Sequence, residues 1–156
     1  ALLGLVLVGA TGAIAALGDT LYPAESLAQG LRDSFSSDSQ PLIQLRKFHP
    51  FSAILVGLYV VLLAKRLARS GPPVAATLST VLTGLYAAQL IAGTVNIVLL
   101  APVTLQLVHL ALADLVWIAL VLLTAATLAE AGSRRSEAEG QEARVGSQEA
   151  RVGVSA

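Results

Sequence analysis

The sequence predicts an all-α protein: a transmembrane four-helix bundle with a disordered polar C-terminal tail. Three observations support this fold class. Of the 156 residues, 55% are hydrophobic and only 13% are charged, whereas a soluble domain carries about 25% charged residues. The mean hydropathy is +0.75. The apolar residues also form four long runs that lack the polar face a soluble helix needs.

Each run is long enough to cross a bilayer, which takes about 17–25 apolar residues. The first predicted span, residues 1–18, carries no charge, and the second lies near 48–66 between two pairs of basic residues. The third and fourth spans, near 77–100 and 103–128, are separated at Pro102, a residue suited to the first turn of a helix. A cleaved signal peptide would explain one such run but not four.

The connections between the spans differ in length and charge. A long polar loop, residues 19–47, follows the first span, and a basic turn over residues 65–76 follows the second. We therefore expect residues 1–130 to form the bundle. Residues 131–156 have mixed charge, a repeated QEARVG segment and few apolar residues, which is typical of a disordered tail. The alternative for this tail is a helix that binds a partner.

The distribution of basic residues predicts the orientation. Lys65, Arg66 and Arg69 lie in one short connection, and Arg134 and Arg135 follow the last span. Because short cytoplasmic segments are enriched in Lys and Arg, we place this turn and the tail in the cytoplasm. The 19–47 loop then faces outward. The prediction is a multi-pass protein of the cell (plasma) membrane, with lipid as its surroundings.

The charge and the cysteine content exclude several classes of function. Lys and Arg together number 10, as do Asp and Glu, so the chain lacks the basic surface of a nucleic-acid-binding protein. It has no cysteine, which excludes disulfides and thiolate metal sites. It also has no methionine, and Ala1 already lies in an apolar run. We therefore expect that the natural start is missing and that the chain is part of a longer protein.

The only two histidines are the strongest candidates for a functional site. His49 begins the second span and His109 lies about two turns into the fourth, so both belong to the outer half of the bundle at similar depth. Two imidazoles facing each other across a four-helix bundle are a common way to hold a haem iron. Zinc is a weaker candidate because two histidines leave its other coordination positions empty. Alternatively, His49 caps a helix and His109 hydrogen-bonds between helices.

Polar and small residues near the histidines fit the same interpretation. Arg46 precedes His49 by three residues, so on a continuous helix both would share a face, and its guanidinium would bind a haem propionate. Gln89, Gly93 and Asn96 are spaced four and three apart and form one stripe on the third span. Small residues on such a stripe allow a flat cofactor to approach. The alternatives are snorkelling of Arg46 to the membrane surface and ordinary hydrogen bonding between helices.

Asp114 stands near the middle of the fourth span, where a carboxylate costs about 2.5–3.5 kcal/mol on insertion scales. Five positions after His109, it points about 140° away from that residue on a regular helix. It therefore does not belong to the iron-binding face. We weigh a proton-transfer role and a structural role equally.

Together these residues resemble the second half of the haem A synthase family. The resemblance runs over about residues 1–130 and is carried by Arg46-x-x-His49-Pro50, by Gln89-x3-Gly93-x2-Asn96, by Pro102, and by His109 with Ala113-Asp114 and Trp117. Family members are eight-helix membrane enzymes built from two similar halves, which oxidise the C8 methyl of haem O to the formyl of haem A. The resemblance implies a haem b on His49 and His109, with haem O as the substrate of the other half.

The chain departs from that family in three ways. Its first span contains no glutamate, it has a single histidine pair, and the 19–47 loop lacks the cysteine pair found in many relatives. We therefore expect the cofactor-holding half, which becomes an oxidoreductase only when it is joined to a missing N-terminal half or paired in a homodimer. The sequence names neither a catalytic residue nor an electron donor. The alternatives are a stand-alone four-helix cytochrome b and a haem-free assembly protein.

Overall fold

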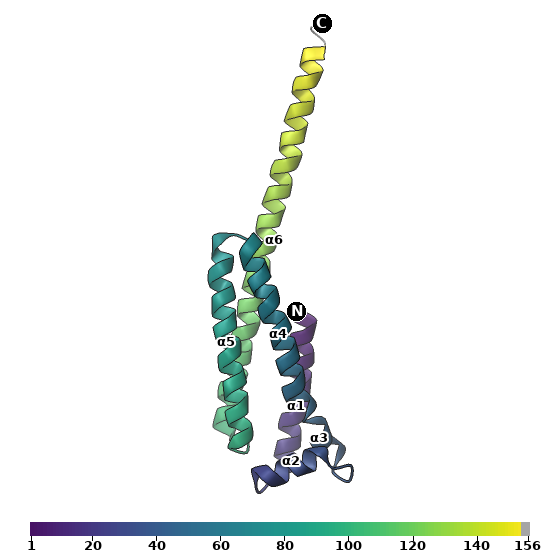
Figure 1. The fold of residues 1–156 in the computed structure, drawn as a ribbon, viewed down its shortest axis with the longest axis vertical. Helices are drawn as coiled ribbons and strands as arrows, with labels where there is room; N and C mark the ends of the chain where they lie inside the picture. Colours follow the sequence, from purple (N-terminus) through teal and green to yellow (C-terminus); the bar gives the residue numbers. More distant parts are fainter. Residues whose placement is uncertain (154–156) are drawn as a thin grey trace.

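The computed structural model describes the backbone of residues 1–153 and the side chains of residues 1–144 and 146. The described chain is helical, without a strand, which confirms the all-α fold. Figure 1 shows the helices in order: α1 (Leu2–Leu21), α2 (Leu27–Phe35), α3 (Pro41–Leu45), α4 (Phe48–Ser70), α5 (Pro73–Val98) and α6 (Val103–Gly153). Four helical segments in this part of the chain are long and apolar enough to cross a membrane, as predicted.

The membrane helices are longer than the apolar runs that predicted them. The turn between α4 and α5 consists of Gly71 and Pro72, whereas the sequence predicted a turn over residues 65–76. Helix α4 continues through its basic residues to Ser70, because long Lys and Arg side chains can extend from a helix end to the membrane surface. Pro73 begins α5, where the missing N–H of proline costs no hydrogen bond.

The loop predicted over residues 19–47 contains two short helices. Helix α2 begins after Ser26, whose hydroxyl accepts a hydrogen bond from the backbone N–H of Gln29 at 3.2 Å. A serine at this position stabilises a helix start. Helices α2 and α3 lie across the ends of α1 and α4, at the opposite end of the bundle from the α4–α5 turn (Figure 1). Length and polarity predicted the connection but not this folded cap.

The hydrophobic core lies in the half of the bundle nearer the α4–α5 turn. Helix α5 packs against both α4 and α6, while α1 packs mainly on α4. The buried apolar residues come from the C-terminal half of α4, from α5 up to its midpoint and from the N-terminal half of α6: Val60, Ala64, Ala75, Leu82, Tyr86, Val116, Ala119, Leu120 and Leu123. The other half of the bundle, which carries both histidines, holds none of these residues.

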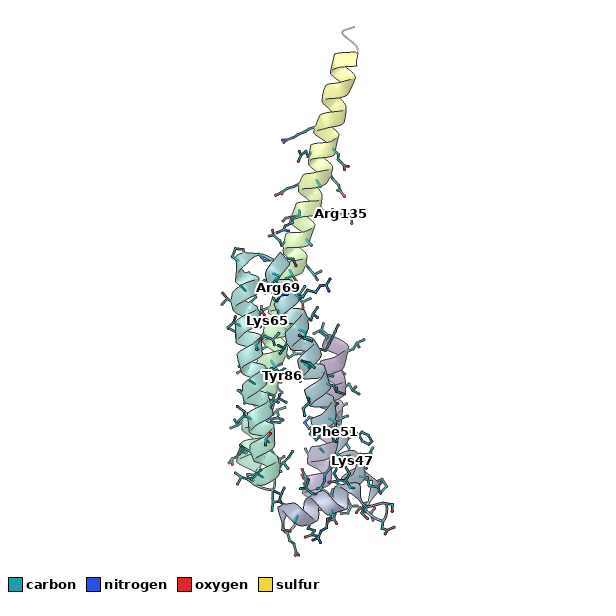
Figure 2. All side chains as sticks on the ribbon, viewed as in Figure 1. Lys47, Phe51, Lys65, Arg69, Tyr86 and Arg135 are labelled. Carbon is teal, nitrogen blue, oxygen red and sulfur yellow. The ribbon has the colours of Figure 1, made fainter. Side chains whose placement is uncertain are left out.

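Helix α6 continues far beyond the bundle (Figure 1). The sequence predicted a disordered tail over residues 131–156. The structure describes a helical extension over residues 131–153, with exposed side chains over residues 131–144, and residues 154–156 lie outside the described residues. Two ion pairs at four-residue spacing support this helix, Arg134 with Glu130 and Arg135 with Glu139, each at 3.0 Å. Figure 2 shows Arg135 on the projecting part.

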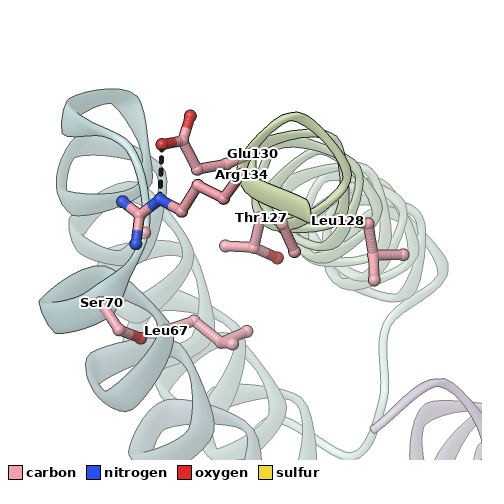
Figure 3. A pocket seen from close by; sticks show the side chains of 8 residues that line it. Leu67, Ser70, Thr127, Leu128, Glu130 and Arg134 are labelled. Atoms are coloured by element: carbon pink, nitrogen blue, oxygen red, sulfur yellow. Dashed lines mark hydrogen bonds and ion pairs between the residues drawn. The ribbon is translucent and has the colours of Figure 1, made fainter. Parts of the chain in front are cut away.

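A cavity of about 320 Å³ lies where α6 leaves the bundle. The end of α4 provides Leu67 and Ser70, and α6 provides Thr127 and the Glu130–Arg134 pair (Figure 3). Because that pair neutralises its own charges, the cavity carries no net charge from these residues. It also lies at the other end of the bundle from the histidines, so it belongs to a different part of the molecule.

Candidate functional site

The two histidines lie next to each other between α4 and α6. The centroids of the His49 and His109 rings are 6.3 Å apart, and the ring planes are nearly perpendicular at 89°. His49 stands in the first turn of α4 and His109 in the second turn of α6. The topology predicted this proximity, because helices running in the same direction bring equivalent positions to equivalent depths. Their role as iron ligands stays a prediction.

Helix α1 fixes the orientation of the His49 ring. Its Nδ1 lies 3.2 Å from the backbone carbonyl oxygen of Val8 and 3.4 Å from the hydroxyl of Thr11. A carbonyl can only accept, so Nδ1 carries the proton and Nε2 keeps its lone pair. Metal-binding histidines are typically held in this way, with one ring nitrogen donating to a carbonyl and the other free for the metal. Ser52 extends the contact, with its hydroxyl 3.2 Å from that of Thr11.

His109 packs against the polar stripe of α5. The side-chain amide nitrogen of Gln89 lies 3.3 Å from Nε2 of His109. Since an amide nitrogen donates, Nε2 of this histidine accepts the hydrogen bond with its lone pair, and that lone pair becomes free for another group only when Gln89 turns away. Asn96 contacts the start of α6 by donating to the carbonyl of Leu105 at 3.4 Å. Gln89 and Asn96 therefore share a face of α5, as their spacing with Gly93 predicted, and the structure shows that this face contacts α6.

Several polar atoms at this site are buried without a partner among the described residues. They are Nδ1 of His109, Oε1 of Gln89 and Oδ1 of Asn96. Buried polar atoms are nearly always hydrogen-bonded, so each exception asks for an explanation such as a bound group. These three atoms come from neighbouring turns of α5 and α6. An additional polar or metal-containing group bound between α5 and α6 would give these three atoms the partners that they lack.

A glycine lies against each histidine ring. A Cβ atom added at Gly12 would lie 2.9 Å from Cε1 of His49, and one added at Gly93 would lie 3.0 Å from Cε1 of His109. Both distances are shorter than ordinary van der Waals contact, so any larger residue would displace a ring. Gly93 was a predicted site residue. The contacts of Gly12, Thr11 and Val8 were not predicted, because a glycine in an apolar helix indicates close packing without naming the partner.

The separation of the two ring centroids matches that of two imidazoles that bind one metal ion. Nitrogen ligands bind at about 2.0–2.1 Å, which places the centroids of two opposed rings roughly 6–6.5 Å apart. The observed 6.3 Å lies in that range. Within residues 1–144, no group of three or more His, Cys, Asp or Glu side chains is arranged to hold a metal. Two imidazoles leave the remaining coordination positions of a metal to ligands other than these side chains, such as the nitrogens of a macrocycle.

Arg46 does not lie on a continuous helix with His49. Helix α3 ends at Leu45 and α4 begins at Phe48, and the backbone N–H of His49 donates to the carbonyl of Arg46 at 3.2 Å across the turn. The predicted shared helix face is therefore replaced by a tight junction. This junction places the guanidinium of Arg46 against α1 and α2.

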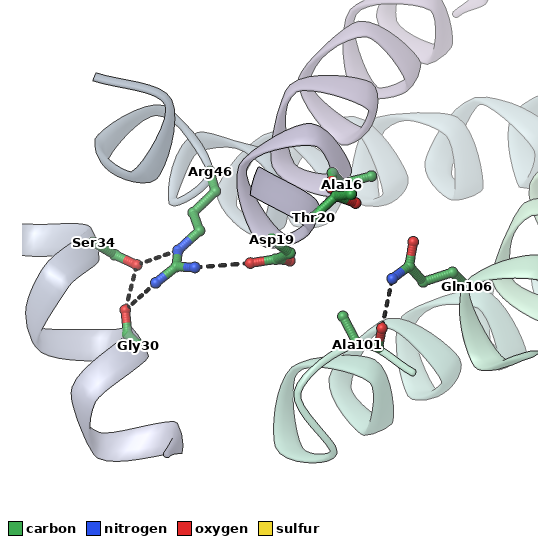
Figure 4. Close-up of polar contacts among 8 residues, drawn as sticks. All are labelled: Ala16, Asp19, Thr20, Gly30, Ser34, Arg46, Ala101 and Gln106. Carbon is green, nitrogen blue, oxygen red and sulfur yellow. Dashed lines mark hydrogen bonds and ion pairs between the residues drawn. The ribbon is translucent and has the colours of Figure 1, made fainter. Parts of the chain in front are cut away.

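The guanidinium of Arg46 connects the cap to the bundle (Figure 4). It forms an ion pair with Asp19 at 2.7 Å, donates to the hydroxyl of Ser34 at 2.7 Å and donates to the carbonyl of Gly30. Its side chain is 13% exposed. Each of its three nitrogens has a partner inside the protein, so in this structure Arg46 stabilises the cap. Its contact with a haem propionate stays a prediction.

Replacing Arg46 by alanine is expected to destabilise the cap. The change leaves a carboxylate, a hydroxyl and a carbonyl without their common partner, which costs about 2–3 kcal/mol for a pair that is partly accessible. The exposed Arg32 of α2 provides the control, because Arg32→Ala removes the same side chain from a surface position. Proteolysis of the 19–47 segment in mild detergent measures the effect. Equal cleavage rates for the two variants would contradict this role for Arg46.

Asp114 is exposed on α6 and has no hydrogen-bond or ion-pair partner among the described residues. It lies away from the two histidines, as its spacing from His109 predicted. Trp117, one turn further on, is 39% exposed. The position of this carboxylate is therefore not explained by contacts within the bundle.

Comparisons with known proteins identify the family. A family model described as cytochrome oxidase assembly protein matches residues 1–121. The chain belongs to this family. The match confirms the resemblance to the haem A synthase family and covers all residues of the candidate site. The family is one of cytochrome oxidase assembly proteins, and the four apolar helices make this family member a multi-pass membrane protein.

Two curated relatives come from two strains of Thermus thermophilus. Both are named protohaem IX farnesyltransferase, and they are 43% and 42% identical to the chain over 144 residues. The match covers 91% of this family member but only 24% of each relative. The chain thus spans about a quarter of the length of these relatives. No solved structure matches it.

Proposed function

We propose that this chain is the haem b-binding half of a haem A synthase. In this proposal His49 and His109 would hold the haem iron, and Gln89, Gly93 and Asn96 would line the cofactor. The bound haem supports oxidation of the C8 methyl of haem O to the formyl of haem A in the other half of the enzyme. The observation that carries the proposal is the 6.3 Å separation of the two imidazole rings.

The residues around the rings prepare them for that role. The carbonyl of Val8 holds His49 with Nε2 free, and Gly12 and Gly93 leave room for the rings to adopt their positions. A haem supplies an iron that accepts and releases one electron, with a potential set by its axial ligands and its surroundings. The apolar helices keep water away from the macrocycle. In the complete enzyme, such a site conducts electrons from an external donor toward the substrate half.

The names of the relatives support a place for this chain in haem modification. Both are called protohaem IX farnesyltransferase, and farnesylation of protohaem yields a haem that carries a farnesyl chain. This chain belongs to a cytochrome oxidase assembly family and matches a quarter of each farnesyltransferase. A domain with both relationships is suited to act on the farnesylated product. Haem O is therefore the proposed substrate of the complete enzyme. The basic residues of the α4–α5 turn and of α6 support a cytoplasmic C-terminus in the plasma membrane, with the histidines toward the outer side.

The test is the optical spectrum of the chain purified from membranes supplied with haem. The unmodified chain is expected to bind one haem per chain with the low-spin spectrum of two imidazole ligands. His49→Ala and His109→Ala should each abolish that spectrum, whereas Tyr59→Phe, an exposed change elsewhere on α4, should preserve it. A low-spin spectrum that persists in either alanine variant would refute the ligand assignment.

A stand-alone cytochrome b is the second candidate, because the bundle brings its two histidines together without help from another chain. The two functions differ in whether haem O is oxidised. Supplying haem O to membranes that contain the chain, alone or with a substrate half from a relative, distinguishes them. Formation of haem A only in the presence of the substrate half supports the synthase, and reversible reduction without any haem A supports the electron carrier.

A further inference from the structure

Helix α2 carries a row of apolar side chains that the bundle leaves largely uncovered. Leu27, Leu31 and Phe35 are spaced four residues apart, so they lie along one side of the helix. We call them the apolar row. Leu31 is 50% exposed and Phe35 is 63% exposed. Because α2 lies across the ends of α1 and α4 (Figure 1), the apolar row stands at the level where two membrane helices end.

The other sides of α2 are polar, and they show how the helix is rotated. The hydroxyl of Ser34 accepts a hydrogen bond from Arg46, so this side of α2 faces the bundle. On a regular helix Arg32 lies about 160° around the axis from Ser34, and it is exposed. Leu31 and Phe35 lie between these two sides, about 60° and 100° from Ser34. Helix α2 therefore presents its apolar row sideways and its charged side away from the bundle.

The apolar row is continuous with the exposed surface at the start of α4. The ammonium of Lys47 lies 5.4 Å from the centroid of the Phe35 ring and 5.8 Å from the centroid of the Phe48 ring. Phe48 is the first residue of α4 and is 52% exposed, and Phe51 in the same turn is 58% exposed. Figure 2 shows Lys47 and Phe51 at this end of the bundle. Since α4 is a membrane helix, these exposed rings border lipid, and the apolar row extends the same surface.

The chemistry of this surface is typical of the boundary between lipid and water. Phenylalanine and leucine form the buried side of helices that lie in this boundary. A lysine beside them rests its apolar stem on the rings and keeps its ammonium in water. Residues 19–47 carry four acidic and three basic side chains, so no excess of positive charge attracts this segment to anionic lipid. The apolar side chains are what would hold it at a membrane.

We propose that α2 is an interfacial helix whose apolar row is inserted into the lipid leaflet that borders the cap. The helix lies in the plane of the membrane, with Arg32 toward water and the apolar row about 5–10 Å inside the boundary between headgroups and acyl chains. Arg46 ties α2 to α1 on one side, and lipid holds it on the other. The cap at the histidine end of the bundle is thus fixed by protein and membrane together. The proposal does not depend on haem binding.

The depth of single nitroxide labels tests this insertion. The chain has no cysteine, so Leu31→Cys and Arg32→Cys each give one label, on the apolar row and on the charged side of the same turn. The labelled full chain is placed in nanodiscs of phosphatidylcholine, which has no net charge. The label at position 31 should collide with oxygen and be shielded from a water-soluble nickel complex, whereas the label at position 32 should meet the nickel complex freely. Equal access of nickel to both labels would overturn the proposal, and so would a label at position 31 that protein shields from both reagents.

A matched pair of substitutions tests whether lipid stabilises α2. Leu31→Gln removes an apolar side chain from the row, and Arg32→Gln places the same residue on the charged side. In the same nanodiscs, hydrogen exchange of the backbone amides of residues 27–35 should become roughly 3- to 10-fold faster in Leu31→Gln, because burial of the leucine side chain in lipid is lost. Exchange in Arg32→Gln should change by less than about twofold, as is usual for surface substitutions. Equal exchange rates in the two variants would contradict the insertion.

Discussion

Replacing Gly57 by alanine is expected to cause the largest loss of stability among glycine-to-alanine substitutions in the bundle. A Cβ atom at this position would lie 2.1 Å from Cε1 of Tyr86, far inside van der Waals contact. The Tyr86 ring is only 4% exposed, and its hydroxyl donates to the carbonyl of Ala53 at 2.8 Å. The ring therefore has no open space to move into. Overpacking costs about 1–3 kcal/mol and loss of the hydrogen bond about 0.5–1.5 kcal/mol more.

Gly84→Ala on α5 is the matched control, because nothing lies within 4 Å of the added methyl group. That variant should be as stable as the parent chain or more stable by up to about 1 kcal/mol, since alanine favours helix over glycine. Unfolding in mild detergent with increasing SDS measures both variants. Adding Tyr86→Leu to Gly57→Ala should recover part of the loss, because the smaller side chain makes room. Equal unfolding midpoints for Gly57→Ala and Gly84→Ala would contradict this packing.

Replacing Gly12 by alanine is expected to disturb the proposed haem site while leaving the fold intact. The added methyl group would lie 2.9 Å from Cε1 of His49, so the ring must turn away. That movement lengthens the contact between Nδ1 and the carbonyl of Val8, which fixes the ring in the unmodified chain. Because only a side chain has to shift, the free energy of unfolding should change by less than about 1 kcal/mol. Haem affinity should fall at least about tenfold, a typical effect of losing such a supporting contact.

Gly9→Ala provides the control, because the same change one turn earlier in α1 has nothing within 4 Å. On the other histidine, Gly93→Ala compares with Gly84→Ala in the same way. Haem titration monitored by the low-spin absorption bands is the measurement. The site variants should bind weakly or with altered bands, and the controls should match the parent chain. Indistinguishable spectra for Gly12→Ala and Gly9→Ala would show that the glycine does not position His49.

The sequence by itself determined the membrane architecture. Four long apolar runs of sufficient length predict helices, because lipid offers no partner for backbone N–H and C=O groups and a helix pairs them within itself. The order of those helices then fixed which loops share a side and placed His49 and His109 at similar depth. The spacing of Gln89, Gly93 and Asn96 placed these residues on a common face of α5, because the periodicity of a helix depends only on the local sequence.

Only the tertiary structure decided which side chains meet. The carbonyl of Val8 and the hydroxyl of Thr11 support His49 from a helix far away in the sequence, and no local pattern records that pairing. Arg46 was expected to serve the cofactor, but the folding of the 19–47 segment placed Asp19 and Ser34 around it. Interactions of this kind depend on the relative positions of whole helices, which are set by packing of the entire bundle. Local sequence determines each helix, whereas the contacts between helices come from the global arrangement.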